Sequence, residues 1–150
     1  MYKNQDLTSI NFSNYLQELS VNFNNRNLGE LDFECSDNLV LNVNQAIPTG
    51  MLINEVTNQV ANYYDSKPDS LCSFRVKVNE EKQIITLKFA LPKGNLSLAD
   101  IIFDNTLSAE LISVILKQLE ADINRDVDER FLEISFQMNP NQRGAHNSLL

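Results

Sequence analysis

The stretch that decides the fold is LNVNQAIPTGMLINEVTNQVANYY, which runs from Leu41 to Tyr64. Its length and its mixture of apolar and polar residues predict a helix that begins at about Asn44 or Ala46 and ends at Tyr64. Pro48 is compatible with this helix because it falls in the first turns, where a backbone N–H is not needed. The polar DSKPDS segment that follows ends the helix.

One face of this helix carries Glu55, Gln59 and Asn62, at positions i, i+4 and i+7. A general base and a metal ligand placed on one face could form a catalytic site. The alternative is a solvated polar face beside an apolar one, without a chemical role. We favour the solvated face.

The flanking sequence predicts further helices and strands on both sides of this helix. Helices are expected at 11–24, with Asn11 as the N-cap, and at 106–122. Strands are expected at 31–35, 39–43, 71–78, 83–91 and 131–136. The strands 71–78 and 83–91 form a hairpin around 79–82, and 92–105 is irregular. This order predicts an α+β fold, a two-layer sandwich with the helices on one face of a mixed sheet.

Composition excludes several classes of function. The chain has 150 residues, which suits one domain, and a net charge of −8, which disfavours nucleic-acid and anionic-membrane binding. No apolar stretch approaches the roughly 20 residues of a membrane span, so no membrane insertion is expected. Cys35 and Cys72 lack metal spacing and are predicted to be thiols in a reducing compartment. We expect a cytoplasmic domain, with 138–150 as a disordered tail that holds the single histidine, His146.

The 41–64 stretch resembles the ATP-site helix of sensor histidine kinases. The residues that coincide with the family pattern are Gln45, Ala46, Ile47, Pro48, Gly50, Asn54, Glu55 and Tyr63. The segment MYKNQDLTSINFSNYLQEL is similar to the family's connection between its phosphoacceptor hairpin and its ATPase domain. The segment TLSAELISVILKQLEADI resembles a later helix of that domain. The resemblance covers 1–137 and implies a histidine kinase-like ATPase fold, shared with gyrase-type enzymes and related chaperones. Residues 1–10 would then be a linker from an absent upstream hairpin.

The resemblance also implies roles for the polar helix face, and two of its three positions depart from the family. Glu55 occupies the position of the catalytic base, and Asn54 matches a nucleotide-site asparagine. The family's magnesium ligand falls on Gln59, whose extra methylene displaces the amide from the tight octahedral geometry that magnesium requires. The family's lysine falls on Asn62, so a charged contact to phosphate is lost.

The loops that would bind the nucleotide depart further from the family. The adenine-binding aspartate falls on Leu91, which cannot accept a hydrogen bond from the adenine amino group. Gly94 remains in the following loop, between Lys93 and Asn95 at family glycine positions. Other family positions that bind or approach phosphate now carry Ser108, Ala109, Glu120, Ala121, Asp128 and Glu129. The nucleotide-site positions Asn54, Gln59, Asn62, Leu91 and Gly94 are therefore predicted to be vestigial, and Glu55 with them.

The resemblance implies a degenerate histidine kinase ATPase-like domain, a pseudokinase that serves two-component signal transduction as a docking or dimerisation module. No cofactor and no metal are expected. The partner would be a response regulator or a kinase hairpin domain, with a homodimer as another possibility. Two alternatives remain: an active kinase domain that binds Mg-ATP through unorthodox ligands such as Asp104, and a purely structural domain that fixes the oligomeric state of a sensor.

The N-terminal segment carries apolar residues without an obvious core partner. Tyr2, Leu7 and Ile10 precede the first predicted helix. Part of 1–23 is therefore expected to form an apolar patch that pairs with a hairpin or with a second copy of the chain.

Overall fold

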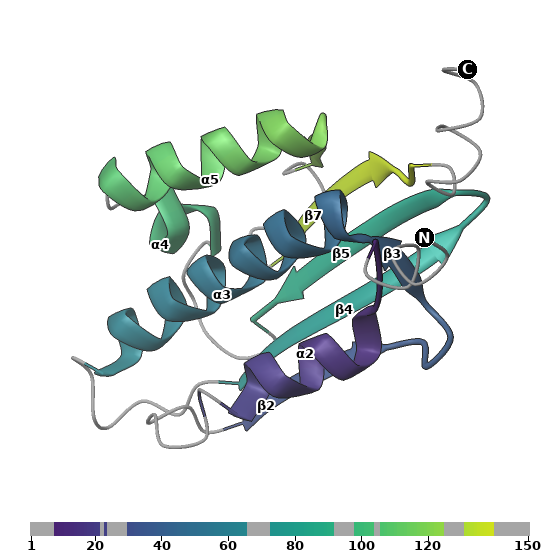
Figure 1. The fold of residues 1–150 in the computed structure, drawn as a ribbon. Coiled ribbons are helices and arrows are strands. Elements are labelled where there is room, and N and C mark those ends of the chain that lie inside the picture. Colours follow the sequence, from purple (N-terminus) through teal and green to yellow (C-terminus); the bar gives the residue numbers. More distant parts are fainter. Residues whose placement is uncertain are drawn as a thin grey trace, which may run out of the picture.

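The computed structural model of the chain has two layers, with the described helices on one face of a sheet (Figure 1). It describes residues 8–21, 23, 30–65, 73–91, 98–103, 106–124 and 131–139. The helices are α2 (Phe12–Val21), α3 (Val43–Asp65), α4 (Leu98–Phe103) and α5 (Thr106–Leu119). The strands are β1 (Ser9–Asn11), β2 (Glu30–Cys35), β3 (Val40–Asn42), β4 (Ser73–Glu81), β5 (Ile84–Ala90), β6 (Asp122–Asn124) and β7 (Phe131–Gln137).

The main sheet has five strands in the order β2-β4-β5-β7-β6. Its first pair, β2 and β4, is parallel, and the other three pairs are antiparallel. The strands β1 and β3 form a separate antiparallel pair. The mixed sheet and the single helical layer confirm the predicted α+β sandwich.

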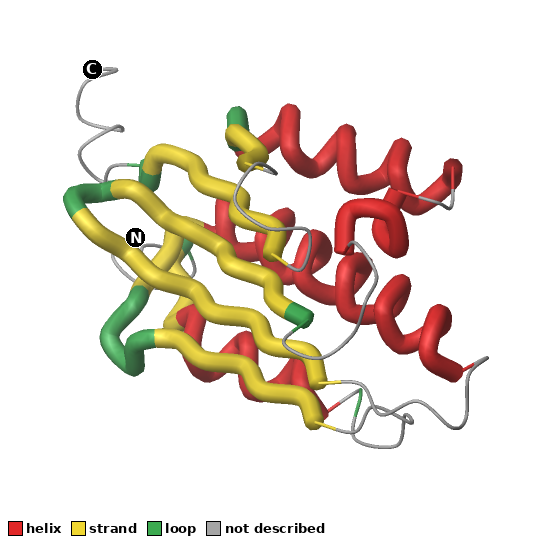
Figure 2. The backbone as a smooth tube through the Cα atoms, turned by 180° about the vertical axis from the view of Figure 1, so that it is seen from behind, coloured by secondary structure: helices red, strands yellow, loops and turns green. Residues whose placement is uncertain are grey.

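The core lies between the sheet and the helices because each central strand alternates apolar and polar residues. The buried side chains of the central strands are Phe74, Val76, Val78, Ile85, Leu87, Phe89, Leu132, Ile134 and Phe136. The helix α3 opposes them with Leu52, Ile53, Val56 and Val60, all fully buried. The opposite face of the sheet carries exposed Arg75, Lys77 and Lys88 and is not covered by any of the described helices (Figure 2).

The central hairpin is tighter than the sequence suggested. The strand β4 continues to Glu81 and β5 starts at Ile84, so the turn is Lys82-Gln83 and not 79–82. Both turn residues have positive φ, 53° and 68°, as a two-residue hairpin turn of the primed type requires. Neither residue is a glycine, so the turn carried no sequence signal.

Three short elements were missed by the sequence analysis. The helix α4 lies within the segment predicted to be irregular and buries Leu98, Ile101 and Ile102. The strand β6 begins at Asp122, because α5 ends three residues before the predicted end. The strand β1 occupies the end of the predicted linker 1–10. Elements of three to six residues are too short to show a periodicity in sequence.

The N-terminus of α2 is capped as the sequence predicts. The Asn11 side chain accepts a hydrogen bond from the backbone N–H of Asn14 at 3.0 Å, which confirms Asn11 as the N-cap.

Ile10 is half-buried and packs against the core, so it is not part of an exposed apolar patch. Tyr2 and Leu7 lie outside the described residues. None of the described helices is both long enough and apolar enough to cross a membrane.

The C-terminus of α5 uses a left-handed residue that is not glycine. Glu120 has a φ of 53°, and the N–H of Ala121 donates to the carbonyl oxygen of Leu116 at 2.9 Å. This is the arrangement of a Schellman cap, in which glycine is the preferred left-handed residue. Glu120 occupies a position where the histidine kinase pattern has glycine.

We expect Glu120→Gly to stabilise the domain by about 0.5–1 kcal/mol, because relief of the left-handed strain exceeds the added chain entropy. Urea denaturation measures the change. Glu120→Ala is the control: it removes the same charged side chain but keeps the Cβ atom. Equal stabilisation by both changes would assign the effect to charge and not to backbone strain.

Candidate nucleotide site

The candidate site lies where α5 crosses α3. Glu55 on α3 is half-buried and faces Ser108 in the first turn of α5, which is 4% exposed. The hydroxyl of Ser108 donates a hydrogen bond to Oε1 of Glu55. The same oxygen accepts from Nε2 of Gln59 at 3.5 Å, the long limit for a hydrogen bond. The carboxylate at the position of the family's base is thus engaged by its own chain.

This contact corrects the predicted solvated face. Glu55 and Gln59 do share a helix face, as their spacing required, but α5 packs over that face and Ser108 contacts it. Ser108 was identified only as a departure from the family's lid, and its contact with Glu55 was missed. The two residues are 53 positions apart, so no local pattern in the sequence could reveal the pair.

The Glu55–Ser108 contact is expected to stabilise the packing of α3 against α5. A hydrogen bond to a charged group contributes about 1.5–3 kcal/mol when well buried, and the half-buried Glu55 should give about 1 kcal/mol. A double-mutant cycle with Glu55→Ala and Ser108→Ala, followed by urea denaturation, measures this coupling free energy.

The matched control pairs Asn62→Ala with Ser108→Ala. Asn62 is exposed, seven positions beyond Glu55 on the same helix. These two changes should add within about 0.5 kcal/mol. Additive effects in the Glu55 cycle would mean that the contact does not hold the two helices together.

Leu91 directly follows β5, at the position of the family's adenine-binding aspartate, and is 1% exposed. It belongs to the same apolar cluster as Phe89, Leu98 and Ile102. At this position the chain therefore has a core side chain and no hydrogen-bond acceptor for a base. Gly94, Lys93 and Asn95 lie outside the described residues, as do Asp104, Asp128 and Glu129.

Other residues that match the family have structural roles in this fold. The side chain of Gln45 donates to the carbonyl oxygen of Gln137 and accepts from the N–H of Asn139, both at 2.8 Å, which joins the start of α3 to the end of β7. Gly50 lies against Tyr15 of α2, and a Cβ atom there would lie 2.6 Å from the tyrosine hydroxyl oxygen. These positions account for family matches without requiring a nucleotide.

The remaining features of the predicted site concern Asn54 and possible metal ligands. Asn54 is half-buried beside Glu55 on α3. In the part of the chain that the structure describes, no group of three or more His, Cys, Asp or Glu side chains could hold a metal ion.

The chain is similar to known proteins in structure and not in sequence. No family model and no curated protein matches the sequence. Among solved structures, the Erythrobacter litoralis EL346 blue-light activated histidine kinase is similar with a TM-score of 0.70 and 14% identity, over 89% of this chain and 47% of that one. This chain thus spans about half the length of that kinase.

Two further structures are similar over nearly their whole length. The catalytic domain of histidine kinase ThkA gives a TM-score of 0.62 at 11% identity, covering 89% of this chain and 98% of that one. The mycobacterial sensor histidine kinase MprB gives a TM-score of 0.62 at 7% identity, covering 88% and 97%. The geometry and these similarities agree with the fold predicted from the 41–64 stretch: the chain has the fold of a histidine kinase catalytic domain.

Proposed function

We propose that this chain is a degenerate histidine kinase ATPase-like domain. It acts in two-component signalling as a docking or dimerisation module and does not turn over ATP usefully. The observation that carries the proposal is the Glu55–Ser108 hydrogen bond, because it engages the carboxylate that would otherwise act on the reacting groups.

Two independent features support the loss of nucleotide binding. Leu91 is buried in the core where adenine would need an acceptor, and an unpaired adenine amino group costs about 1–3 kcal/mol of affinity. Gln59 donates to Glu55 and has a longer side chain than the family's magnesium ligand. Three parts of the site are therefore impaired separately: the contact to adenine, the contact to the metal and the availability of the catalytic carboxylate.

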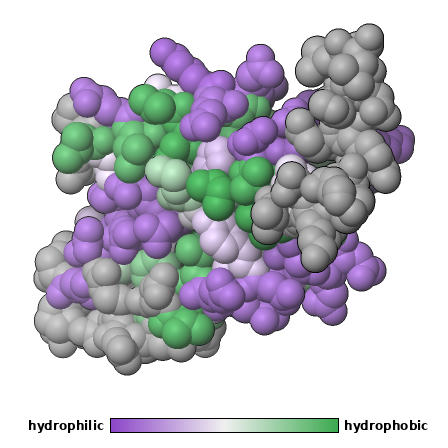
Figure 3. Space-filling model, viewed as in Figure 1, coloured by the Kyte–Doolittle hydropathy of each residue, from purple (hydrophilic) through white to green (hydrophobic). Residues whose placement is uncertain are grey.

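A docking role requires an exposed surface, and α5 has one. Apolar side chains gather over α5 in Figure 3. They include Leu107, Leu111 and Val114, which are 76%, 38% and 61% exposed and lie at positions i, i+4 and i+7. This stripe has the spacing with which one helix packs against another. It fits a helical partner such as a kinase hairpin, and it also allows a response regulator or a second copy to bind through a helix.

The proposal is tested by titrating the domain with Mg-ATP while its thermal unfolding is followed. A ligand at 100 times its Kd stabilises a protein by about 2.7 kcal/mol, which is readily detected. We expect no shift at millimolar Mg-ATP, whereas an active histidine kinase catalytic domain measured in parallel should shift clearly. A saturable shift would instead support the alternative of an ATP-binding kinase domain.

A further inference from the structure

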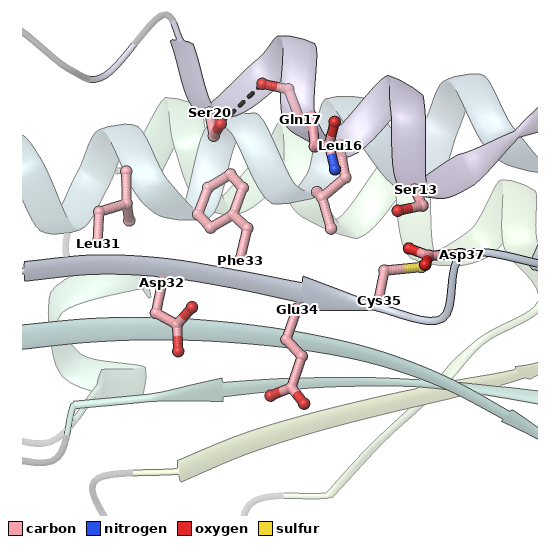
Figure 4. A pocket seen from close by; sticks show the side chains of 10 residues that line it. All are labelled: Ser13, Leu16, Gln17, Ser20, Leu31, Asp32, Phe33, Glu34, Cys35 and Asp37. Carbon is pink, nitrogen blue, oxygen red and sulfur yellow. Dashed lines mark hydrogen bonds between the residues drawn. The ribbon is translucent and has the colours of Figure 1, made fainter.

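A groove of about 390 Å³ follows β2 beneath α2 (Figure 4). Five successive residues of the strand, Leu31 to Cys35, line it. Successive side chains of a strand point to opposite faces of its sheet. A groove that contacts five residues in succession therefore runs along the edge of the strand, where the backbone N–H and C=O groups lie.

The strand β2 is at one edge of the five-stranded sheet. It pairs with β4 on one side, and no described strand pairs with its other side. The α2 side chains that border the groove include Ser13, Gln17 and Ser20, so the helix contributes a polar rim. An edge of this kind is a template for an added strand, with main-chain hydrogen bonds as the source of affinity.

The two faces of β2 differ in chemistry. Leu31 and Phe33 point toward α2 and are half-buried, whereas Asp32 and Glu34 point away from it and are exposed (Figure 4). Cys35 is also half-buried in the groove. Burial, together with the nearby Asp37 carboxylate, raises the pKa of Cys35 to about 11, so this thiol is neutral at pH 7.

The charges on β2 determine which strand could pair with it. Asp32 and Glu34 lie in register with Arg75 and Lys77 of β4, so the acidic side chains of β2 already lie opposite basic side chains on this face. Antiparallel pairing of β2 with β2 of a second copy would place carboxylates beside carboxylates, which is destabilising. A basic strand would place basic side chains on the free side of these carboxylates and is favoured.

We propose that the outer edge of β2 binds an extended segment of another protein in which apolar and basic residues alternate. The apolar side chains would enter the groove under α2, and the basic ones would lie beside Asp32 and Glu34. The segment would add a sixth strand to the sheet. This inference names a surface and a partner chemistry for the docking role proposed above.

The first experiment uses short peptides of alternating valine and lysine. One version carries N-methyl groups on alternate residues along one edge, and a second carries them along the opposite edge. Strand addition requires backbone donors on only one peptide edge, so one version should bind and the other should lose binding. Fluorescence anisotropy gives the affinities. Equal binding by both versions, or no binding by the unmodified peptide at millimolar concentration, would overturn the proposal.

The second experiment reverses the charges on β2. We expect the double variant Asp32→Lys, Glu34→Lys to bind the valine–lysine peptide about tenfold more weakly and to gain affinity for a valine–glutamate peptide. The control is Glu110→Lys with Asp122→Lys, which changes the net charge equally at exposed positions on α5 and β6. An equal loss in both double variants would show attraction by net charge and no site at β2.

The two proposals fail separately in these experiments. Binding of Mg-ATP would overturn the pseudokinase assignment and leave the β2 site intact. Failure of the peptide experiments would remove β2 as a surface and leave α5 as the basis for docking. Hydrogen exchange locates the site directly, because the peptide should protect amides within 31–35 and not those of α5.

Discussion

Replacement of Leu91 by aspartate should unfold the domain and should not restore an adenine site. The change returns the residue type that the histidine kinase pattern has after this strand, but Leu91 is 1% exposed and packs within the core. A carboxylate in that position has no partner among the apolar side chains of the cluster, so it would cost several kcal/mol or force uptake of a proton. Circular dichroism during urea denaturation measures the loss of stability.

The matched control is Leu107→Asp, which makes the same substitution where the leucine is 76% exposed on α5. It should change stability by no more than about 0.5 kcal/mol. If Leu91→Asp remained as stable as this control and bound Mg-ATP, Leu91 would line a nucleotide site. The placement of Leu91 within the apolar core would then be wrong.

Long elements with strong patterns were predictable from the sequence. The α3 helix was expected from about Asn44 or Ala46 to Tyr64 and is found from Val43 to Asp65. Its proline lies in the second turn, its apolar face is buried, and its length left no competing interpretation. The strands β4, β5 and β7 were also clear, because in each of them buried residues alternate with less buried ones over most of the strand.

Features that depend on contacts distant in sequence were not predictable. The pairing of β1 with β3 joins residues about 30 positions apart, and neither strand exceeds three residues. The helix α4 is held by burial of Leu98, Ile101 and Ile102 and not by a long periodic pattern. Such elements form because the rest of the fold covers them, and their local sequence alone does not specify them.

In the candidate site, too, the local pattern was predictable and the contact between distant residues was not. The sequence correctly placed Glu55 and Gln59 on one face of α3, because helical spacing alone determines that result. It could not predict which element would cover the face. Ser108 was compared only with a family glycine, but in the structure its hydroxyl donates to the Glu55 carboxylate. The serine at this position thus supplies a contact between α5 and α3.

The second large loss of stability is expected on the face of α3 that is opposite Glu55. Val60 is fully buried, and Val60→Asp should cost several kcal/mol because the carboxylate enters the core without a partner. Val114→Asp is the control, since this valine is 61% exposed on α5 and its replacement should cost no more than about 0.5 kcal/mol. Both variants are compared by urea denaturation.

Comparison of the two variants separates the role of α3 in the core from the proposed role of α5 in docking. Val114→Asp should leave the domain folded and weaken docking through the α5 stripe, because a charge would enter an apolar helix contact. Val60→Asp should lose structure first, and any loss of docking would follow from unfolding. Equal destabilisation by the two substitutions would mean that the α5 stripe is buried in the folded protein in solution, and it could then not be the surface on which a partner helix docks.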